Sequence, residues 1–192
     1  ATLSFPLTVG LLLFAHPFVD LWLGPGYSRV AFTLQILSLG YLVNILSGPG
    51  FSILNGTGRP QYGVYSSLLA AFLNLILGLI LVTQFGYYGV VMGTFLSMVI
   101  AAGFFKWVFH RVSGIPWDIT FRQIFLPPFL SASTAAGLCA LLLYNLPVGG
   151  LFGLASIISV FGVAYLLLLI LCGYIRKEDS TRLWQALAIK PR

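Results

Sequence analysis

The chain has 192 residues, of which 59% are hydrophobic and only 7% are charged, whereas soluble domains average about 25% charged residues. Its mean hydropathy is +0.99, which excludes a soluble globular domain because a core of this size cannot hide so much apolar surface. The formal net charge of +6 does not indicate nucleic-acid binding, because the charges lie between apolar segments rather than on one face.

Six apolar segments follow one another along the chain, each close to the about 20 residues that a helix needs to cross the hydrocarbon layer. They run over residues 3–21, 31–54, 62–85, 88–108, 125–146 and 151–175. None alternates apolar and polar residues as a membrane β-barrel requires, and lipid permits only helices or closed barrels. We therefore predict an all-α integral membrane protein with six transmembrane helices.

The distribution of basic residues predicts the orientation of these spans. Nine of the ten Lys and Arg residues fall on one side of the membrane: Arg59, Lys106, Arg111, Arg122, Arg176, Lys177, Arg182, Lys190 and Arg192. Arg29 falls on the other side. Because basic residues accumulate on the cytoplasmic side, we predict a multi-pass protein of the cell (inner) membrane with a cytoplasmic C-terminus.

The first span contains a candidate site for coupling to Na⁺ or H⁺. His16 and Asp20 are four positions apart near its predicted outer end, with Pro17 between them. A carboxylate and an imidazole in contact tune each other's protonation, as ion coupling requires. A polar pair at the level of the headgroups needs no such role, so both interpretations stay open.

Two asparagines are predicted to lie near the middle of the membrane. Asn44 is about halfway along the second span and Asn74 about halfway along the third, which crosses in the opposite direction. Polar groups in lipid are costly. The two amides either hydrogen-bond between helices or, with Ser47, line a polar cavity for a substrate.

The second span is predicted to bend next to these residues. Gly48, Pro49 and Gly50 interrupt it with one residue that lacks a backbone N–H and two that weaken a helix. Transporters place bent helices around their translocation path. Pro and Gly are also common in ordinary membrane helices, so the bend does not by itself indicate transport.

Small residues mark predicted contacts between helices. Gly89 and Gly93 are spaced four apart, and Ser66, Ala70, Asn74 and Gly78 recur every four residues on one face of the third span. Such patterns allow the backbones of two membrane helices to approach closely. We predict helix packing at both.

The two cysteines are expected to be buried free thiols. Cys139 and Cys172 both fall in apolar segments, but at different depths, and a disulfide requires the two Cα atoms to lie within about 7 Å.

Catalytic chemistry and metal binding are not expected. The chain has only four acidic residues, and its sequence contains no metal-ligand cluster, nucleophile elbow or phosphate-binding loop. We also expect no cofactor.

Several motifs together resemble a known family. They are residues 54–60 (LNGTGRP) after the bent span, 73–75 (LNL), 85–94 (FGYYGVVMGT), and 22–24 (WLG) followed by Tyr27. The chain resembles the C-terminal half of polysaccharide flippases in the multidrug/oligosaccharidyl-lipid/polysaccharide exporter superfamily, which also contains multidrug and toxin extruders and lipid II flippases.

The resemblance implies a division of the chain. Residues 1–114 would be four helices of the second lobe of a 14-helix exporter, 115–175 its final helix pair, and 176–192 a cytoplasmic tail. Because the chain opens at Ala1 without an initiator methionine, we expect that an N-terminal lobe is missing from it.

The function implied by the resemblance is the flipping of a polyprenyl-pyrophosphate-linked oligosaccharide across the membrane, by alternating access, for O-antigen, capsule or exopolysaccharide biosynthesis. Family members hold the anionic carrier with cationic residues in a central cavity, whereas this chain has none deep in a span. Arg59 and Lys106, near the cytoplasmic mouth, are the candidates to contact the pyrophosphate, although membrane orientation alone explains both.

The implied partners are the lipid bilayer and the lipid-linked oligosaccharide, with a polysaccharide polymerase or glycosyltransferases as further candidates; we expect a monomer. Three alternatives stay open: an ion-coupled multidrug or toxin extruder, a non-transporting membrane scaffold of a polysaccharide assembly complex, and a membrane glycosyltransferase. For the last of these, Asp20 and Asp118 are the available carboxylates away from the C-terminal tail.

Overall fold

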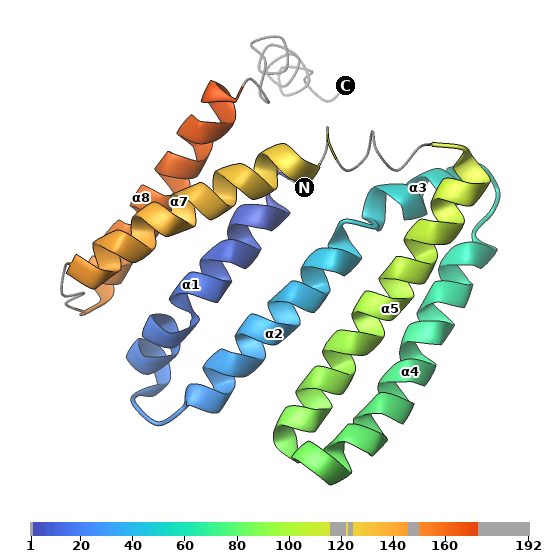
Figure 1. Cartoon of the computed structure of the whole chain (residues 1–192), viewed down its shortest axis with the longest axis horizontal. Helices are drawn as coiled ribbons and strands as arrows, with labels where there is room; N and C mark the ends of the chain where they lie inside the picture. The colour runs from blue at the N-terminus through green and yellow to red at the C-terminus, as the bar shows by residue number, and fades with distance from the viewer. Residues whose placement is uncertain (1, 116–121, 123–124, 146–149, 173–192) are drawn as a thin grey trace, which may run out of the picture.

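The computed structural model describes residues 2–115, 122, 125–145 and 150–172 of the chain. Within these ranges the protein consists of helices and short connections (Figure 1). The helices are α1 (Ser4–Leu23), α2 (Ser28–Ile45), α3 (Gly48–Gly56), α4 (Gln61–Phe85), α5 (Tyr87–Ser113), α7 (Leu126–Asn145) and α8 (Gly150–Leu171). The all-α prediction is confirmed.

Five segments are long and apolar enough to cross a membrane. They are Ser4–Leu23, Ser28–Gly56, Gln61–Phe85, Tyr87–Ser113 and Phe152–Leu171, the second of them made of α2 and α3 together. The predicted fifth span forms α7, but its described apolar part, Leu126–Leu141, is shorter than the other five. The protein is therefore a multi-pass membrane protein with five candidate spans, and the sixth stays a prediction.

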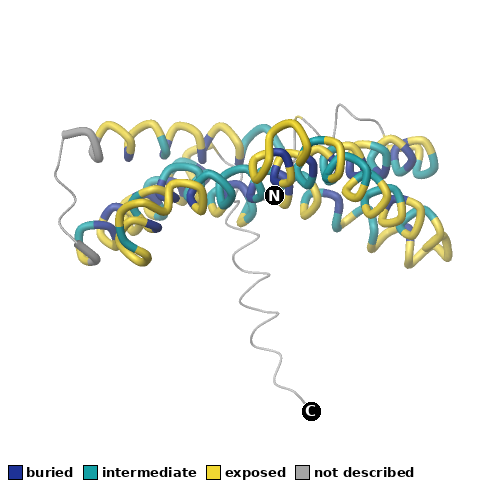
Figure 2. Tube along the Cα trace, turned by 90° about the horizontal axis from the view of Figure 1, so that it is seen from below, coloured by how far each residue is buried: buried dark blue, intermediate teal, exposed yellow. Residues whose placement is uncertain are grey.

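The helices α1, α2, α5 and α4 lie side by side in this order and form a curved layer (Figures 1 and 2). The order differs from the chain order because α5 packs between α2 and α4. Helices α7 and α8 pack on each other and on α1, at the opposite edge of the layer from α4. The predicted boundary between residues 114 and 115 thus precedes a helix pair whose packing partner is the first helix.

The closest packing in the layer joins α4 to α5. Gly86 alone connects the two helices, with a positive φ of 56° that favours glycine. A Cβ atom on Gly93 would lie 2.9 Å from the backbone nitrogen of Gly78. Further along, the buried Ser66 hydroxyl donates a hydrogen bond to the Ala101 carbonyl, at 3.0 Å. Both predicted small-residue patterns therefore lie in the same helix–helix contact.

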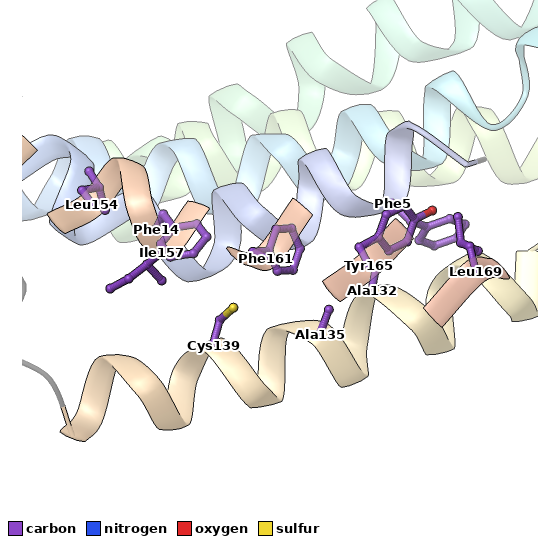
Figure 3. Close-up of a cluster of buried hydrophobic side chains, with 10 residues drawn as sticks. All are labelled: Phe5, Phe14, Ala132, Ala135, Cys139, Leu154, Ile157, Phe161, Tyr165 and Leu169. Atoms are coloured by element: carbon purple, nitrogen blue, oxygen red, sulfur yellow. The ribbon is translucent and has the colours of Figure 1, made fainter. Parts of the chain in front are cut away.

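A hydrophobic core joins α1, α7 and α8 (Figure 3). Its buried members are Phe5, Phe14, Ala132, Ala135, Cys139, Leu154, Ile157, Phe161, Tyr165 and Leu169. The Phe14 and Phe161 rings meet edge to face, with centroids 6.0 Å apart. The Tyr165 hydroxyl donates a hydrogen bond to the Thr2 carbonyl, so the start of the chain is tied to α8.

Both cysteines are free, as predicted, but only one of them is buried. Cys139 belongs to the core, whereas Cys172 is exposed immediately after the last residue of α8. The predicted burial of Cys172 is therefore wrong. The apolar segment continues to Ile175 in the sequence. In a membrane protein an apolar segment contacts lipid as well as protein, so hydropathy does not predict whether a side chain within it is buried in protein.

Helix α5 is longer than the predicted fourth span. It continues past Val108 to Ser113 and ends at Gly114, whose φ of 70° is the left-handed conformation that closes many helices. Its last turn carries His110 and Arg111, and basic groups near a helix C-terminus interact favourably with the helix dipole. The helix therefore extends beyond the apolar part of its sequence.

Candidate functional site

The break between α2 and α3 lies where the sequence predicted a bend. Helix α2 ends at Ile45 and α3 begins at Gly48. At the end of α2 the hydrogen bonds tighten, because the Ser47 N–H donates to the Asn44 carbonyl only three residues earlier, at 2.9 Å. Pro49 lies in the first turn of α3, where a missing N–H costs no helix hydrogen bond. The Gly48-Pro49-Gly50 sequence thus starts a new helix.

Aromatic rings hold α3 against α4 and α5. The Phe51 ring stacks on Phe105, with centroids 3.8 Å apart and an angle of 3° between the planes. A Cβ atom on Gly63 of α4 would lie 3.0 Å from the Phe51 ring, and one on Gly50 would lie 3.1 Å from the Phe105 ring. The two glycines therefore allow the short helix to approach both of its neighbours.

A cavity of about 190 Å³ lies next to the break, between α2 and α3 on one side and α4 and α5 on the other. Its polar lining residues are Asn44, Ser66, Ser67, Asn74 and Ser97, and the others are Phe51, Ala70, Ala71, Met98, Ala101 and Ala102. The two asparagines thus lie near each other, as expected from the sequence, while their role in transport stays a prediction.

Some side-chain hydrogen-bond donors and acceptors of the cavity wall are engaged within the protein, and others are not. The Thr94 hydroxyl shares its single hydrogen between the Val90 carbonyl oxygen of its own helix, at 3.0 Å, and Asn74 Oδ1, at 3.2 Å; the second contact joins α5 to α4. The Ser97 hydroxyl donates to the Thr94 carbonyl at 2.7 Å. Within the described part of the chain, no hydrogen bond engages the Asn44 amide or the Asn74 amide nitrogen. Asn74 therefore bridges helices through Thr94 and still presents an N–H₂ group.

Ser47, the third predicted cavity residue, lies outside the cavity wall. It is 3% exposed, and its hydroxyl donates to the Val43 carbonyl of its own helix, at 3.2 Å. It sits three residues after Asn44, where α2 ends, and its hydroxyl is engaged by the backbone rather than presented to the cavity.

The predicted ion-coupling pair is far from this cavity in the layer. His16 and Asp20 are both exposed on α1, which is separated from α4 and α5 by α2. Among the residues that the structure describes, no ion pair or hydrogen bond links these two side chains. Coupling through them stays a prediction.

The two predicted pyrophosphate contacts also lie outside the cavity. Arg59 is exposed in the connection between α3 and α4. Lys106 is half-buried in α5, with its Nζ 5.4 Å from the centre of the Phe125 ring. Arg111, one turn further, places its guanidinium 5.4 Å from the Trp107 ring centre. These cations gather at the end of the layer where α3 and α5 end and α4 begins (Figure 1).

One polar residue at this end was not singled out from the sequence. His110 is buried, and its Nδ1 lies 2.7 Å from the Ile115 carbonyl oxygen. The contact ties the last turn of α5 to the residue after the Gly114 cap. The available signal was a basic residue in the last turn before a glycine, where side chains often bond to chain-end carbonyls.

No protein-family model and no solved structure matches the chain. The chain is similar to an uncharacterized membrane protein of the archaeon Methanocaldococcus jannaschii, with 30% identity over 105 residues. The match covers 55% of this chain and 20% of the archaeal protein, so the chain corresponds to about one fifth of that relative. The similarity supports a membrane protein and assigns no activity.

Proposed function

We propose that this chain is part of a membrane transporter that flips a polyprenyl-pyrophosphate-linked oligosaccharide by alternating access, without altering it chemically. The observation that carries the proposal is the cavity beside the break between α2 and α3, which is lined by two amides and three hydroxyls in an otherwise apolar protein. Irregular backbone at membrane depth is tolerated where it contacts protein or a water-filled cavity. Polar groups there indicate a substrate or ion pathway.

The family resemblance supports the same proposal, because three of its four motifs lie on the helices that form this site. Residues 54–60 end α3 and lead into α4, and Asn74 of the 73–75 motif lines the cavity. Residues 85–94 contain the Gly86 connection and the two glycines that bring α5 close to α4. The motif residues thus position the helices that form the cavity.

The charge distribution supports a cytoplasmic location for the end of the layer that carries Arg59 and Arg111. Arg29 begins α2 at the opposite end. With this orientation, Arg59 is placed at the cytoplasmic mouth, where it is available to an anionic carrier. Within the described part of the chain, no Lys or Arg lines the cavity, so the proposal requires cations from elsewhere in the complete protein to hold the pyrophosphate.

The test is flux in sealed proteoliposomes made with the complete protein. A radiolabelled polyprenyl-pyrophosphate oligosaccharide and a cationic dye are followed in the same vesicles, and protein-free vesicles give the background. We expect the lipid-linked sugar to cross and the dye to remain. Dye flux alone would make the protein an extruder, and no flux of either from folded protein would favour the scaffold.

A further inference from the structure

Two amides at mid-membrane lie exposed on the surface of the layer. Asn74 is near the middle of α4, Asn44 is just before the α2–α3 break, and both side chains are exposed in the chain. An amide group that faces hydrocarbon without hydrogen-bond partners is strongly disfavoured. This face of the layer therefore requires a polar contact, from water, from a polar ligand or from another part of the complete protein.

The opposite side of α4 has the character expected for lipid contact. Phe72 and Leu79 are each 62% exposed, and Leu68 lies on the same side. By the helical period these positions point away from Ser66, Ala70 and Asn74. Helix α4 thus separates an apolar surface from the polar cavity.

The chemistry of the cavity wall favours a neutral ligand that is rich in hydroxyl groups. Among the residues that the structure describes, no Lys, Arg, Asp or Glu lines the cavity. A pyrophosphate is normally held by cationic groups, and a divalent cation by carboxylates. Amides and hydroxyls, in contrast, both donate and accept hydrogen bonds, as the hydroxyls of a sugar require.

The size of the cavity limits how much of such a ligand it holds. Its volume of about 190 Å³ corresponds to about six water molecules at about 30 Å³ each. Pockets that enclose a drug-sized molecule have about 300–1,000 Å³. The cavity therefore has room for one sugar ring and not for a whole oligosaccharide.

We infer that the cavity between α2, α4 and α5 is a subsite for one neutral sugar ring of the transported oligosaccharide, and that the pyrophosphate is held elsewhere. The inference rests on the proposed function. Asn44 and the Asn74 amide nitrogen are the hydrogen-bonding groups available to the sugar hydroxyls, while the hydroxyls of Ser66 and Ser97 already donate to backbone carbonyls.

The test uses cysteine substitution in the complete protein, reconstituted in vesicles and treated with a water-soluble maleimide. Asn44→Cys and Asn74→Cys report on the cavity. Phe72→Cys, at similar depth on the apolar side of α4, and Ser47→Cys, which is buried, are the matched controls. A maleimide reacts with the thiolate, which forms in water and not in lipid. We expect labelling above that of the unsubstituted protein at the two cavity positions and not at the two controls.

Protection by ligand then identifies what the cavity takes. The probes are polyprenyl pyrophosphate carrying one hexose, the same carrier without sugar, and sodium chloride against potassium chloride. At ten times its Kd the sugar-bearing carrier should slow labelling of Asn44→Cys about tenfold, and the other two should not. Equal protection by the sugar-free carrier, protection by sodium alone, or no labelling of folded protein would each overturn the inference.

The outcome is distinguishable from failure of the proposed function. If the complete protein flips the lipid-linked oligosaccharide but the hexose-bearing carrier does not protect Asn44→Cys, the transporter stands and the subsite is rejected. If the carrier protects the site but no flux occurs, the subsite stands and the transport function is rejected.

Discussion

The contact between α4 and α5 leads to a quantitative prediction at Gly93. An alanine there would place its methyl group 2.9 Å from the Gly78 nitrogen and 3.0 Å from the Leu77 carbonyl carbon. Both are backbone atoms, so no side-chain rotation relieves the contact and the two helices must move apart. Overpacking of this kind costs about 1–3 kcal/mol. We expect Gly93→Ala to destabilise the protein by that amount relative to an alanine at an uncrowded position of the same helix.

Gly103 provides a matched control in the same helix. A Cβ atom there meets nothing within 4 Å, and alanine is favoured over glycine in a helix by about 1 kcal/mol. Both variants gain this preference because both sites lie inside α5, so the two should differ by the overpacking cost alone, about 1–3 kcal/mol. Thermal denaturation of the complete protein in detergent, followed by circular dichroism, measures the difference. Equal melting temperatures for Gly93→Ala and Gly103→Ala would refute the proposed close contact.

Three other predictions follow from the packing and the cavity. Phe51→Ala removes the ring stack that holds α3, and because Phe51 is only half-buried it should cost less than the about 3–5 kcal/mol of a fully buried ring, whereas Phe85→Ala, at an exposed position, should cost little in the same melting experiment. Asn74→Leu should lower lipid-linked oligosaccharide flux about tenfold, the worth of one hydrogen bond to a ligand, with little change in melting temperature; unchanged flux would remove its role in transport. In folded protein a small thiol reagent should modify Cys172 and spare Cys139, which is 0% exposed, and modification of both at similar rates would contradict the core packing of α7.

The helices could be predicted from the sequence because the bilayer imposes two requirements on a spanning segment, and both can be recognised in the sequence. A span must be long enough to cross and must satisfy its backbone hydrogen bonds internally, so each apolar segment with Gly or Pro at its ends became a helix. Small residues at four-residue spacing were equally informative. Gly93 and the four-residue repeat that begins at Ser66 allow close backbone contact, and the structure places them in the α4–α5 contact.

The order of the helices was not predictable in the same way. Lipid tails are as apolar as leucine, so an apolar face gains little by choosing protein over lipid, and hydropathy does not identify its neighbour. Nothing in the sequence of α5 signalled that it packs between α2 and α4, or that α7 and α8 pack on α1. The same reason explains why Cys139 and Cys172, both in apolar surroundings by sequence, differ in burial.

The polar residues indicate where a helix faces protein or a cavity rather than lipid, which the apolar residues do not. They do so only in part. Depth along a helix is readable from residue number, so Asn44 and Asn74 were expected at the same level. Rotation about the helix is set by packing, so the sequence did not show that the Ser47 hydroxyl bonds to the Val43 carbonyl of its own helix while Asn44 lies on the cavity wall. The hydrogen bond from Thr94 orients the Asn74 oxygen toward α5 and leaves its nitrogen available. Because Asn74 uses one polar atom for helix packing and lines the cavity with the other, packing and the proposed binding depend on the same residue, so flux and stability must be measured on the same Asn74 variant.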